Sequence, residues 1–148
     1  MSDDSSSFQI RAANPADATA LARLATQLGY PSSQEQVQHR LVPLSGNPEH
    51  AVRVAVRDGQ VVGWVHAFVC RLVESDPYAE IGGLVVDELC RGEGAGRLLL
   101  RRVEQWAREK GCQAVSLRCN VLREKTHVFY EGLGYARIKT QHTFRKEL

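Results

Sequence analysis

A strand-like segment that runs into a glycine-rich turn is the feature that most restricts the fold of this chain. Leu84–Val86 is typical of a strand, three glycines follow within Arg91–Arg97, and Leu98–Leu100 continues as an apolar helix start. The beginning of a helix exposes N–H groups without intrahelical partners and the positive end of the helix dipole. Glycines lack a Cβ and let an anion approach those N–H groups, so the segment predicts a phosphate-binding turn.

Two common nucleotide-binding motifs do not match this turn. A P-loop places Lys and then Ser or Thr after its last glycine, whereas Gly96 is followed by Arg97 and Leu98. The dinucleotide fingerprint GxGxxG fails because Arg97 occupies the place of its last glycine, counted from Gly92. A switch driven by ATP or GTP is therefore disfavoured.

The alternation of apolar and polar residues predicts a mixed α/β sheet in one domain, residues 8–148. Asn14 before Pro15 and Ser33 before Gln36 are typical helix starts. The expected order is a strand at 8–12, helices at 15–28 and 33–42, strands at 51–57, 60–73 and 78–86, a long helix ending at Gly111, a strand at 113–119, a helix at 123–131 and one or two strands within 135–144.

Composition excludes several classes of function. With 148 residues and a formal net charge of +2, the chain lacks the basic excess of a dedicated nucleic-acid binder. The most apolar run, Val61–Cys70, is too short to span a bilayer. Met1–Ser7 has two acids and no apolar stretch, which predicts a disordered tail instead of a signal peptide. The four cysteines show no metal-site spacing, so we expect reduced, mostly buried thiols in a cytoplasmic protein.

Two motifs together resemble one enzyme family. Arg91–Gly96 matches the Arg/Gln-x-x-Gly-x-Gly/Ala signature of the GCN5-related N-acetyltransferases (GNAT), and Phe129–Tyr135 is similar to the family's second motif. The order of elements fits from about Phe8 to the end of the chain. The resemblance implies the acyl-CoA N-acyltransferase fold, with a mostly antiparallel sheet of about six or seven strands that splays at a β-bulge and about four flanking helices.

The resemblance also implies where acetyl-CoA binds. The glycine-rich turn would hold the pyrophosphate, and the pantetheine arm would pair with the preceding strand, whose Gly82 and Gly83 suit a bulge. Glu93 must then point away from the phosphates. Asn120 would contact the pantetheine arm in place of the asparagine that the family often carries where this chain has Arg123. The implied coenzyme-binding residues are Leu84, Val85, Val86, Arg91, Gly92, Glu93, Gly94, Ala95, Gly96, Arg97, Asn120 and Arg123.

Two residues match the catalytic positions of the family. Tyr130 corresponds to the tyrosine that donates a proton to the departing coenzyme A thiolate. Glu80 matches the glutamate that serves several members as general base, directly or through water. Glu74 and Asp76 are alternatives for the base. No metal ion is needed for this chemistry.

The implied reaction moves an acetyl group from acetyl-CoA to the primary amine of a small molecule by direct attack in a ternary complex, as in the aminoglycoside acetyltransferase-like branch. Protein lysines or N-termini are the alternative acceptors, and a catalytically silent CoA-binding sensor is the alternative function. Homodimers are frequent in the family, whereas no nucleic-acid or membrane partner is expected. The residues expected to line the acceptor site are Tyr30, Glu35, Trp64, His66 and Glu74.

The small net charge conceals an asymmetry along the chain. Residues 1–90 carry six basic and eleven acidic side chains, and residues 91–148 carry thirteen basic and six acidic ones. The half that would hold the coenzyme phosphates is thus basic. The half that would receive the acceptor is acidic, as a cationic amine prefers.

Overall fold

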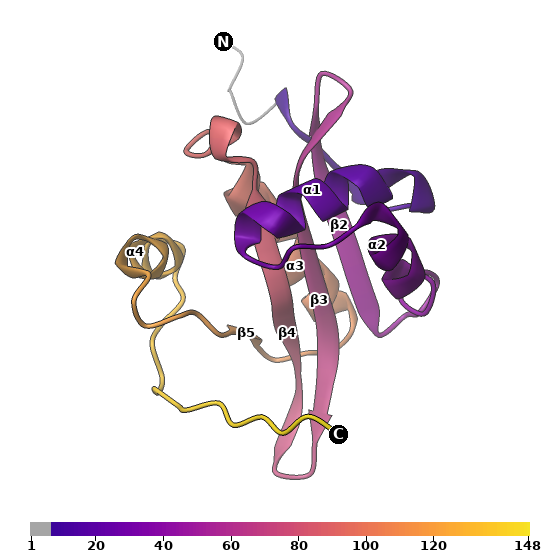
Figure 1. Ribbon diagram of the computed structural model, residues 1–148. Helices are drawn as coiled ribbons and strands as arrows, with labels where there is room; N and C mark the ends of the chain where they lie inside the picture. Colours follow the sequence, from indigo (N-terminus) through magenta and orange to yellow (C-terminus); the bar gives the residue numbers. More distant parts are fainter. Residues whose placement is uncertain (1–6) are drawn as a thin grey trace. The chain divides into compact units, whose positions relative to one another are not determined.

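The computed structural model describes residues 7–148, which form two compact units, one ending at Leu117 and the other spanning Arg118–Leu148 (Figure 1). The predicted tail, 1–7, lies outside the described residues except for Ser7. The first unit contains the sheet and the first three α-helices. The second contains one helix, α4 (Glu124–Gly132), and an extended C-terminal segment.

The sheet of the first unit has five strands in the order β1-β2-β3-β4-β5. The first four pair antiparallel and β5 pairs parallel with β4, so the mixed α/β class is confirmed. The bounds of the strands are β1 Gln9–Ala12, β2 His50–Arg57, β3 Gln60–Leu72, β4 Ser75–Val86 and β5 Val115–Leu117.

The strand count is lower than the predicted six or seven. The expected strands within 135–144 are absent from the described structure, where this segment has no regular secondary structure. A strand requires a neighbouring backbone that satisfies its N–H and C=O groups, and no strand of the described chain pairs with this segment. Ile138 and Phe144 are accordingly 81% and 92% exposed. The turn predicted at 74–77 is also shorter, because β4 already begins at Ser75.

Helices cover both faces of the sheet in the first unit. Helices α1 (Ala18–Leu28) and α2 (Gln34–Leu41) lie on one face, and α3 (Ala95–Glu109) lies on the other (Figure 1). The predicted starts are confirmed: the Asn14 side chain accepts from the Ala16 N–H, and Ser33 and Gln36 form a reciprocal capping box. Asn14 caps a short 3-10 turn, Pro15–Asp17, that leads directly into α1.

The two faces have separate apolar cores. Leu99, Leu100 and Val103 of α3 are at most 1% exposed. On the opposite face, Leu21 and Leu41 pack against Val54 of β2. Burying each such side chain contributes about 1.5–3 kcal/mol, so the strands that carry the site are held firmly from both sides.

A bulge interrupts β4 at the predicted position. His66 of β3 pairs with Gly83 and Ala67 pairs with Ile81, which leaves Gly82 as the extra residue. On the other side of β4, β5 pairs only with Ala79–Ile81. In the sheet as described, β4 therefore has no strand neighbour on its β5 side from Gly82 onward. This splayed edge positions the candidate site.

Candidate functional site

The free edge of β4 presents backbone groups that an extended ligand can pair with. The Asp87 N–H donates to the Val62 carbonyl of β3 at 2.7 Å. Because antiparallel hydrogen bonding alternates along a strand, the N–H groups of Leu84 and Val86 point away from β3. Val85 instead belongs to the β3 ladder, and its side chain is 4% exposed. The Val86 carbonyl accepts from Nε of Arg91 at 3.3 Å, which ties the strand to the turn that follows.

The glycine-rich turn begins after a short 3-10 helix, Glu88–Cys90, and opens α3. Gly92 and Gly94 have φ angles of +82° and +100°, which glycine adopts without a steric penalty. A Cβ at either residue would meet nothing within 4 Å, so the space above the turn is open. The first helical hydrogen bond runs from the Leu98 N–H to the Gly94 carbonyl at 3.1 Å.

The N–H groups of the first turn of α3 therefore precede the helical hydrogen-bond ladder. The residues that carry them are Ala95, Gly96 and Arg97. Arg91 and Arg97 are exposed, whereas Ala95 and Gly96 are buried. An open cradle of N–H groups with two arginines nearby fits a phosphate group.

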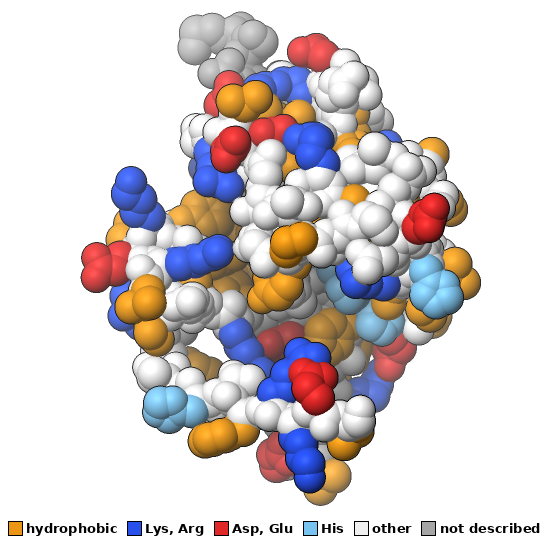
Figure 2. All heavy atoms as spheres, viewed as in Figure 1, with side chains coloured by type: hydrophobic (Ala, Val, Ile, Leu, Met, Phe, Trp, Pro, Cys, Tyr) orange, Lys and Arg blue, Asp and Glu red, His pale blue; other side chains and the backbone are white. Residues whose placement is uncertain are grey.

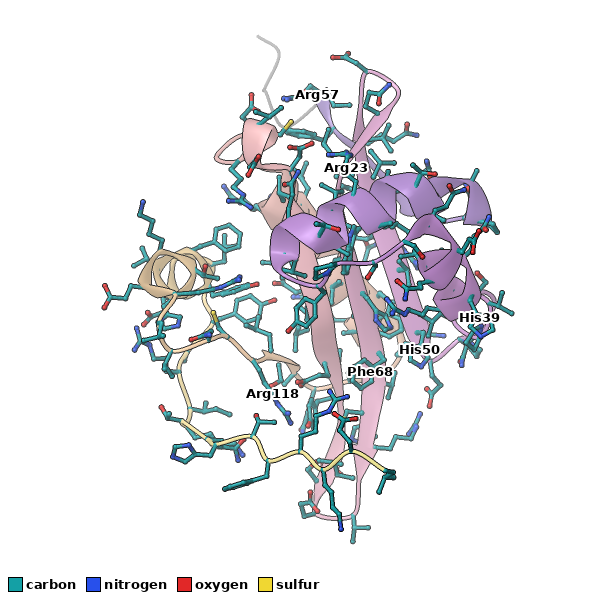
Figure 3. All side chains as sticks on the ribbon, viewed as in Figure 1. Arg23, His39, His50, Arg57, Phe68 and Arg118 are labelled. Atoms are coloured by element: carbon teal, nitrogen blue, oxygen red, sulfur yellow. The ribbon has the colours of Figure 1, made fainter. Side chains whose placement is uncertain are left out.

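Glu93, whose charge opposes this role, is paired with an arginine that sequence reasoning missed. Nη2 of Arg57 lies 3.1 Å from Oε2 of Glu93 and 3.2 Å from Sγ of Cys90, and the guanidinium stacks 4.8 Å from the centre of the Phe8 ring (Figure 3). The Glu93 carboxylate raises the pKa of Arg57 further. The pair offsets the negative charge of the turn.

A second arginine anchors the entrance of the turn to α1. Nη1 of Arg23 donates to Oδ2 of Asp87 at 2.8 Å, and Oδ1 of Asp87 accepts from the Leu89 N–H at 3.1 Å. Oε1 of Gln27 accepts from the Glu88 N–H at 3.0 Å. The Arg23 hydrogen bond, with smaller contributions from Leu89 and Gln27, lowers the pKa of Asp87. These contacts hold the end of β4 and the start of the turn in one arrangement.

Glu80 lies on β4, two residues before the bulge. It is half-buried and pairs with Phe68 across the β3 ladder and with Ser116 of β5, so it lies on the same face of the sheet as Phe68. Glu74 lies in the β3–β4 turn, eight residues from Gly82, which is about 26 Å along an extended strand. The geometry therefore favours Glu80 over Glu74 as the carboxylate near the bulge.

The predicted acceptor-lining residues separate into two groups. Trp64 and His66 lie on the sheet face beneath the two N-terminal helices, and Nε1 of Trp64 donates to the Leu21 carbonyl at 3.3 Å. Tyr30, Glu35 and Glu74 are exposed, with Tyr30 at 70%.

The second unit contains the remaining predicted residues. Tyr130 of α4 packs edge-on against Phe129 and Tyr135 at ring distances of 5.2 and 5.9 Å. Burial raises its pKa to about 12, and the Arg123 charge opposes this shift only partly. Oδ1 of Asn120 accepts from the Leu122 N–H at 2.9 Å, which leaves the side-chain NH₂ as its donor for a ligand.

The other features of the described residues concern membrane spans, metal ligands and cysteines. None of the helices in the described part of the chain is both long and apolar enough to cross a membrane. Across residues 7–148, no three His, Cys, Asp or Glu side chains cluster as ligands for a metal ion. The four cysteines are free and half-buried, thus less buried than predicted.

A splayed sheet edge that leads into an open, glycine-rich helix start has the form that an extended, phosphorylated ligand requires. The model of the acetyltransferase (GNAT) family matches residues 18–135, so the chain belongs to this family and is an acetyl-CoA-dependent acetyltransferase.

Curated relatives and a solved structure agree with this assignment. The chain is 31% identical over 145 residues to an aminoglycoside N(6')-acetyltransferase type 1 of Stenotrophomonas maltophilia, covering 94% of this chain and 93% of the relative. It is 34% identical over 90 residues to an aminoalkylphosphonate N-acetyltransferase of Salmonella typhimurium, covering 60% and 58%. An aminoglycoside N-acetyltransferase in complex with coenzyme A shares the fold, with a TM-score of 0.85, 19% identity and 95% coverage of both chains.

Proposed function

We propose that this protein transfers the acetyl group of acetyl-CoA to a primary amine of a small molecule, by direct attack in a ternary complex. The observation that carries the proposal is the continuous path from the open β4 edge into the glycine-rich turn. The acceptor class is supported by the relative that matches nearly the whole chain, which is named for acetylation of an aminoglycoside amine.

The residues of the first unit fit the coenzyme. The outward N–H group of Val86 would pair with the pantetheine arm that runs along Leu84–Val86, and the residues from Arg91 to Arg97 would hold the pyrophosphate. The space above Gly92 and Gly94 supports this fit, because a Cβ at either position would occupy it. When bound, acetyl-CoA supplies the acyl thioester and the departing thiol.

The acceptor must lose protons before it becomes an amide. A typical primary amine has a pKa near 10.4, so deprotonation at pH 7 costs about 4–5 kcal/mol. In our proposal, Glu80 attracts the ammonium group to the bulge and accepts its first proton, directly or through water. The Leu84 N–H, the outward donor nearer the bulge, would donate to the oxygen that gains negative charge during attack.

Tyr130 would act on the sulfur that leaves, as the family pattern implies. A pKa of about 12 keeps the phenol protonated throughout the physiological range. A free thiol has a pKa near 8.5, which is roughly 3–4 pKa units below that of the phenol. Complete transfer of the phenolic proton to the thiolate would therefore be energetically unfavourable. We therefore assign to Tyr130 a strong hydrogen bond to the thiolate. We assign Asn120 and Arg123 to the pantetheine arm.

We further propose that both compact units belong to one catalytic domain, residues 8–148. The match to the family extends from 18 to 135 and so includes parts of both units.

Release of coenzyme A thiol with a panel of acceptors tests the proposal. The panel contains aminoglycosides with a 6'-amine, aminoalkylphosphonates, and peptides with a free lysine or a free N-terminus. Faster release with a small amine is the expected result. Faster release with peptides would overturn the small-molecule acceptor and point to protein amines. Tight binding of coenzyme A without turnover of any amine would favour a catalytically silent sensor. Glu80→Gln and Tyr130→Phe variants that retain full turnover would overturn the site assignment.

A further inference from the structure

Two histidines near the bulge have no role in the proposed reaction. Nδ1 of His50 on β2 lies 3.0 Å from Nε2 of His66 on β3, and the ring centroids are 5.3 Å apart. Phe68 packs against both rings at 5.7 and 5.9 Å (Figure 3). In Figure 2, histidine side chains reach the surface at the α2 side of this face. The sequence pattern predicts His66 only as an acceptor-lining residue and gives no role to His50.

The second ring nitrogen of His66 faces the bulge. A Cβ built at Gly82 would lie 3.4 Å from Nδ1 of His66 and 3.7 Å from Cε1 of Phe68. Because Gly82 has no side chain and is exposed, Nδ1 borders an open position on the sheet surface. This position is next to the point where β4 leaves β5, at which the proposed acetyl donor would run along the edge.

The contact between the imidazoles restricts the placement of protons. One nitrogen of the pair must donate and the other accept, because two N–H groups cannot share a hydrogen bond. If Nε2 of His66 donates to Nδ1 of His50, neutral His66 has its lone pair on Nδ1, toward Gly82. His50 then fixes the tautomer in which His66 is a base at the bulge.

The stoichiometry of acetylation requires more than one proton acceptor. A primary ammonium group has three N–H bonds, and the secondary amide retains one. One proton must leave before attack and a second as the C–N bond forms. Glu80 accounts for the first, and the thiol recovers one proton in the complete reaction, but the second transfer needs a base at the nitrogen itself.

We propose that His66 accepts this second proton on Nδ1, with His50 as the positioning residue that holds the required tautomer. The amine N–H bond breaks, its electron pair stays on the nitrogen that becomes the amide, and an N–H bond forms on Nδ1. The resulting imidazolium returns the proton to water after product release. This inference rests on the proposed function and adds a catalytic residue to the same site.

The surroundings of His66 support a neutral base. Burial lowers the pKa of His66, and protonation of neighbouring His50 would lower it further. Glu80 pairs with Phe68 across the β3 ladder, and Glu49, which precedes His50, accepts from Nε of Arg71 at 2.8 Å. Helix α2 on the same side carries Glu35, His39 and Arg40. Helix α1 presents apolar Leu28 toward Gly83.

Four variants test the proposal, with thiol release measured on the best amine from the panel. His66→Gln retains an amide group near the position of Nε2 but has no base at Nδ1. It should lower kcat about 100-fold, leave coenzyme A binding within twofold and remove the histidine-dependent acidic limb from the pH profile. His50→Asn keeps an acceptor near Nδ1 and should retain most activity, whereas His50→Leu should lose it. His39→Gln, the same substitution at an exposed histidine of α2, is the matched control and should behave as wild type.

Each outcome separates this inference from the proposed function. Normal wild-type turnover with an unchanged His66→Gln rate and pH profile would overturn only the role of His66. Equal losses in the Asn and Leu variants of His50 would overturn the tautomer argument. A wild-type protein that binds coenzyme A but acetylates no amine would overturn the proposed function, and this role with it. Nitrogen-15 NMR of the imidazoles gives an independent readout: a proton on Nδ1 of neutral His66 would contradict the proposal.

Discussion

Alanine substitutions at Gly82 and Gly83 should have opposite consequences, although the two residues are adjacent in β4. At Gly83, a Cβ would lie 3.0 Å from both Cη2 and Cζ3 of Trp64. This ring cannot yield easily, because its Nε1 donates to the Leu21 carbonyl of α1. At Gly82, the closest atom is Nδ1 of His66 at 3.4 Å, an ordinary contact, and φ is outside the left-handed region.

The magnitudes follow from this difference. Overpacking of a well-packed site costs about 1–3 kcal/mol. Replacing glycine with alanine restricts the unfolded chain and contributes about 0.4–1 kcal/mol in the opposite direction. Gly83→Ala should therefore destabilise the protein by about 1–2 kcal/mol. Gly82→Ala should leave its stability unchanged or raise it by up to about 1 kcal/mol, while its methyl group covers Nδ1 of His66 and lowers turnover.

Urea unfolding measures the contrast directly. With a slope of about 1–3 kcal/mol per molar urea for a protein of this size, the two midpoints should differ by about 1 M. Thiol release with the same proteins then separates stability from activity. Equal midpoints, or a lower midpoint for Gly82→Ala, would refute the assignment of Gly82 as the extra residue of the bulge. Full turnover by a stable Gly82→Ala variant would contradict an acceptor site over this residue.

Three further predictions concern the turn, the second unit and pH. Gly94→Ala forces alanine to a φ of +100°, which costs about 1–2 kcal/mol. We expect this variant to raise the Kd for coenzyme A about tenfold, measured by calorimetry. The control is Gly111→Ala, at a φ of +78° beyond the end of α3, which should lower the stability of the protein without lowering its affinity for coenzyme A. Tyr130→Phe should lower kcat about 10–100-fold in steady-state kinetics with little change in the KM for acetyl-CoA, because one hydrogen bond to a charged atom is lost. Folding lowers the pKa of His66 below its unfolded value near 6.5. The contribution of neutral His66 to the free energy of unfolding is therefore complete above pH 6.5 and is lost as the pH falls through the folded pKa. Between pH 7 and pH 5, the urea midpoint of the wild type should fall more steeply than that of His66→Gln.

Local signals explain why the helix starts and the turn could be predicted from the sequence. A cap involves residues two or three positions apart, such as Ser33 and Gln36, so the sequence contains both partners within one turn. The glycines of the turn are also a local signal, because their backbone conformation depends on the residues next to them. The bulge was predictable for a similar reason, because two adjacent glycines inside a strand are typical of a β-bulge.

The contacts that complete the candidate site depend on residues far apart in the chain. His50 and His66 are 16 positions apart, Arg57 and Glu93 36, and Arg23 and Asp87 64. A single sequence does not indicate which arginine meets which carboxylate, because each could pair with many others. The register of β2 and β3 decides that the two imidazoles meet, and a slip of one residue would place them on opposite faces.

The prediction of C-terminal strands failed for a related reason. Alternating side chains from Tyr135 to Phe144 are compatible with a strand, but compatibility does not supply a partner backbone. Sequence patterns describe which face a side chain would take, whereas pairing is a property of two segments.

The ion pairs also change how the charge asymmetry should be understood. Residues 1–90 hold six basic side chains, and four of their arginines pair with carboxylates: Arg11 with Asp17, Arg23 with Asp87, Arg57 with Glu93 and Arg71 with Glu49. Three of these carboxylates also belong to residues 1–90. The four ion pairs therefore involve four of the six basic side chains in this half and only three of its eleven acidic ones. The fourth carboxylate, Glu93, belongs to residues 91–148 and pairs with Arg57. This pair makes the glycine-rich turn less negative and leaves the acidic excess of residues 1–90 in place. The opposite fields that favour a phosphate at one place and an ammonium group at another are therefore compatible with the ion pairs of the folded chain.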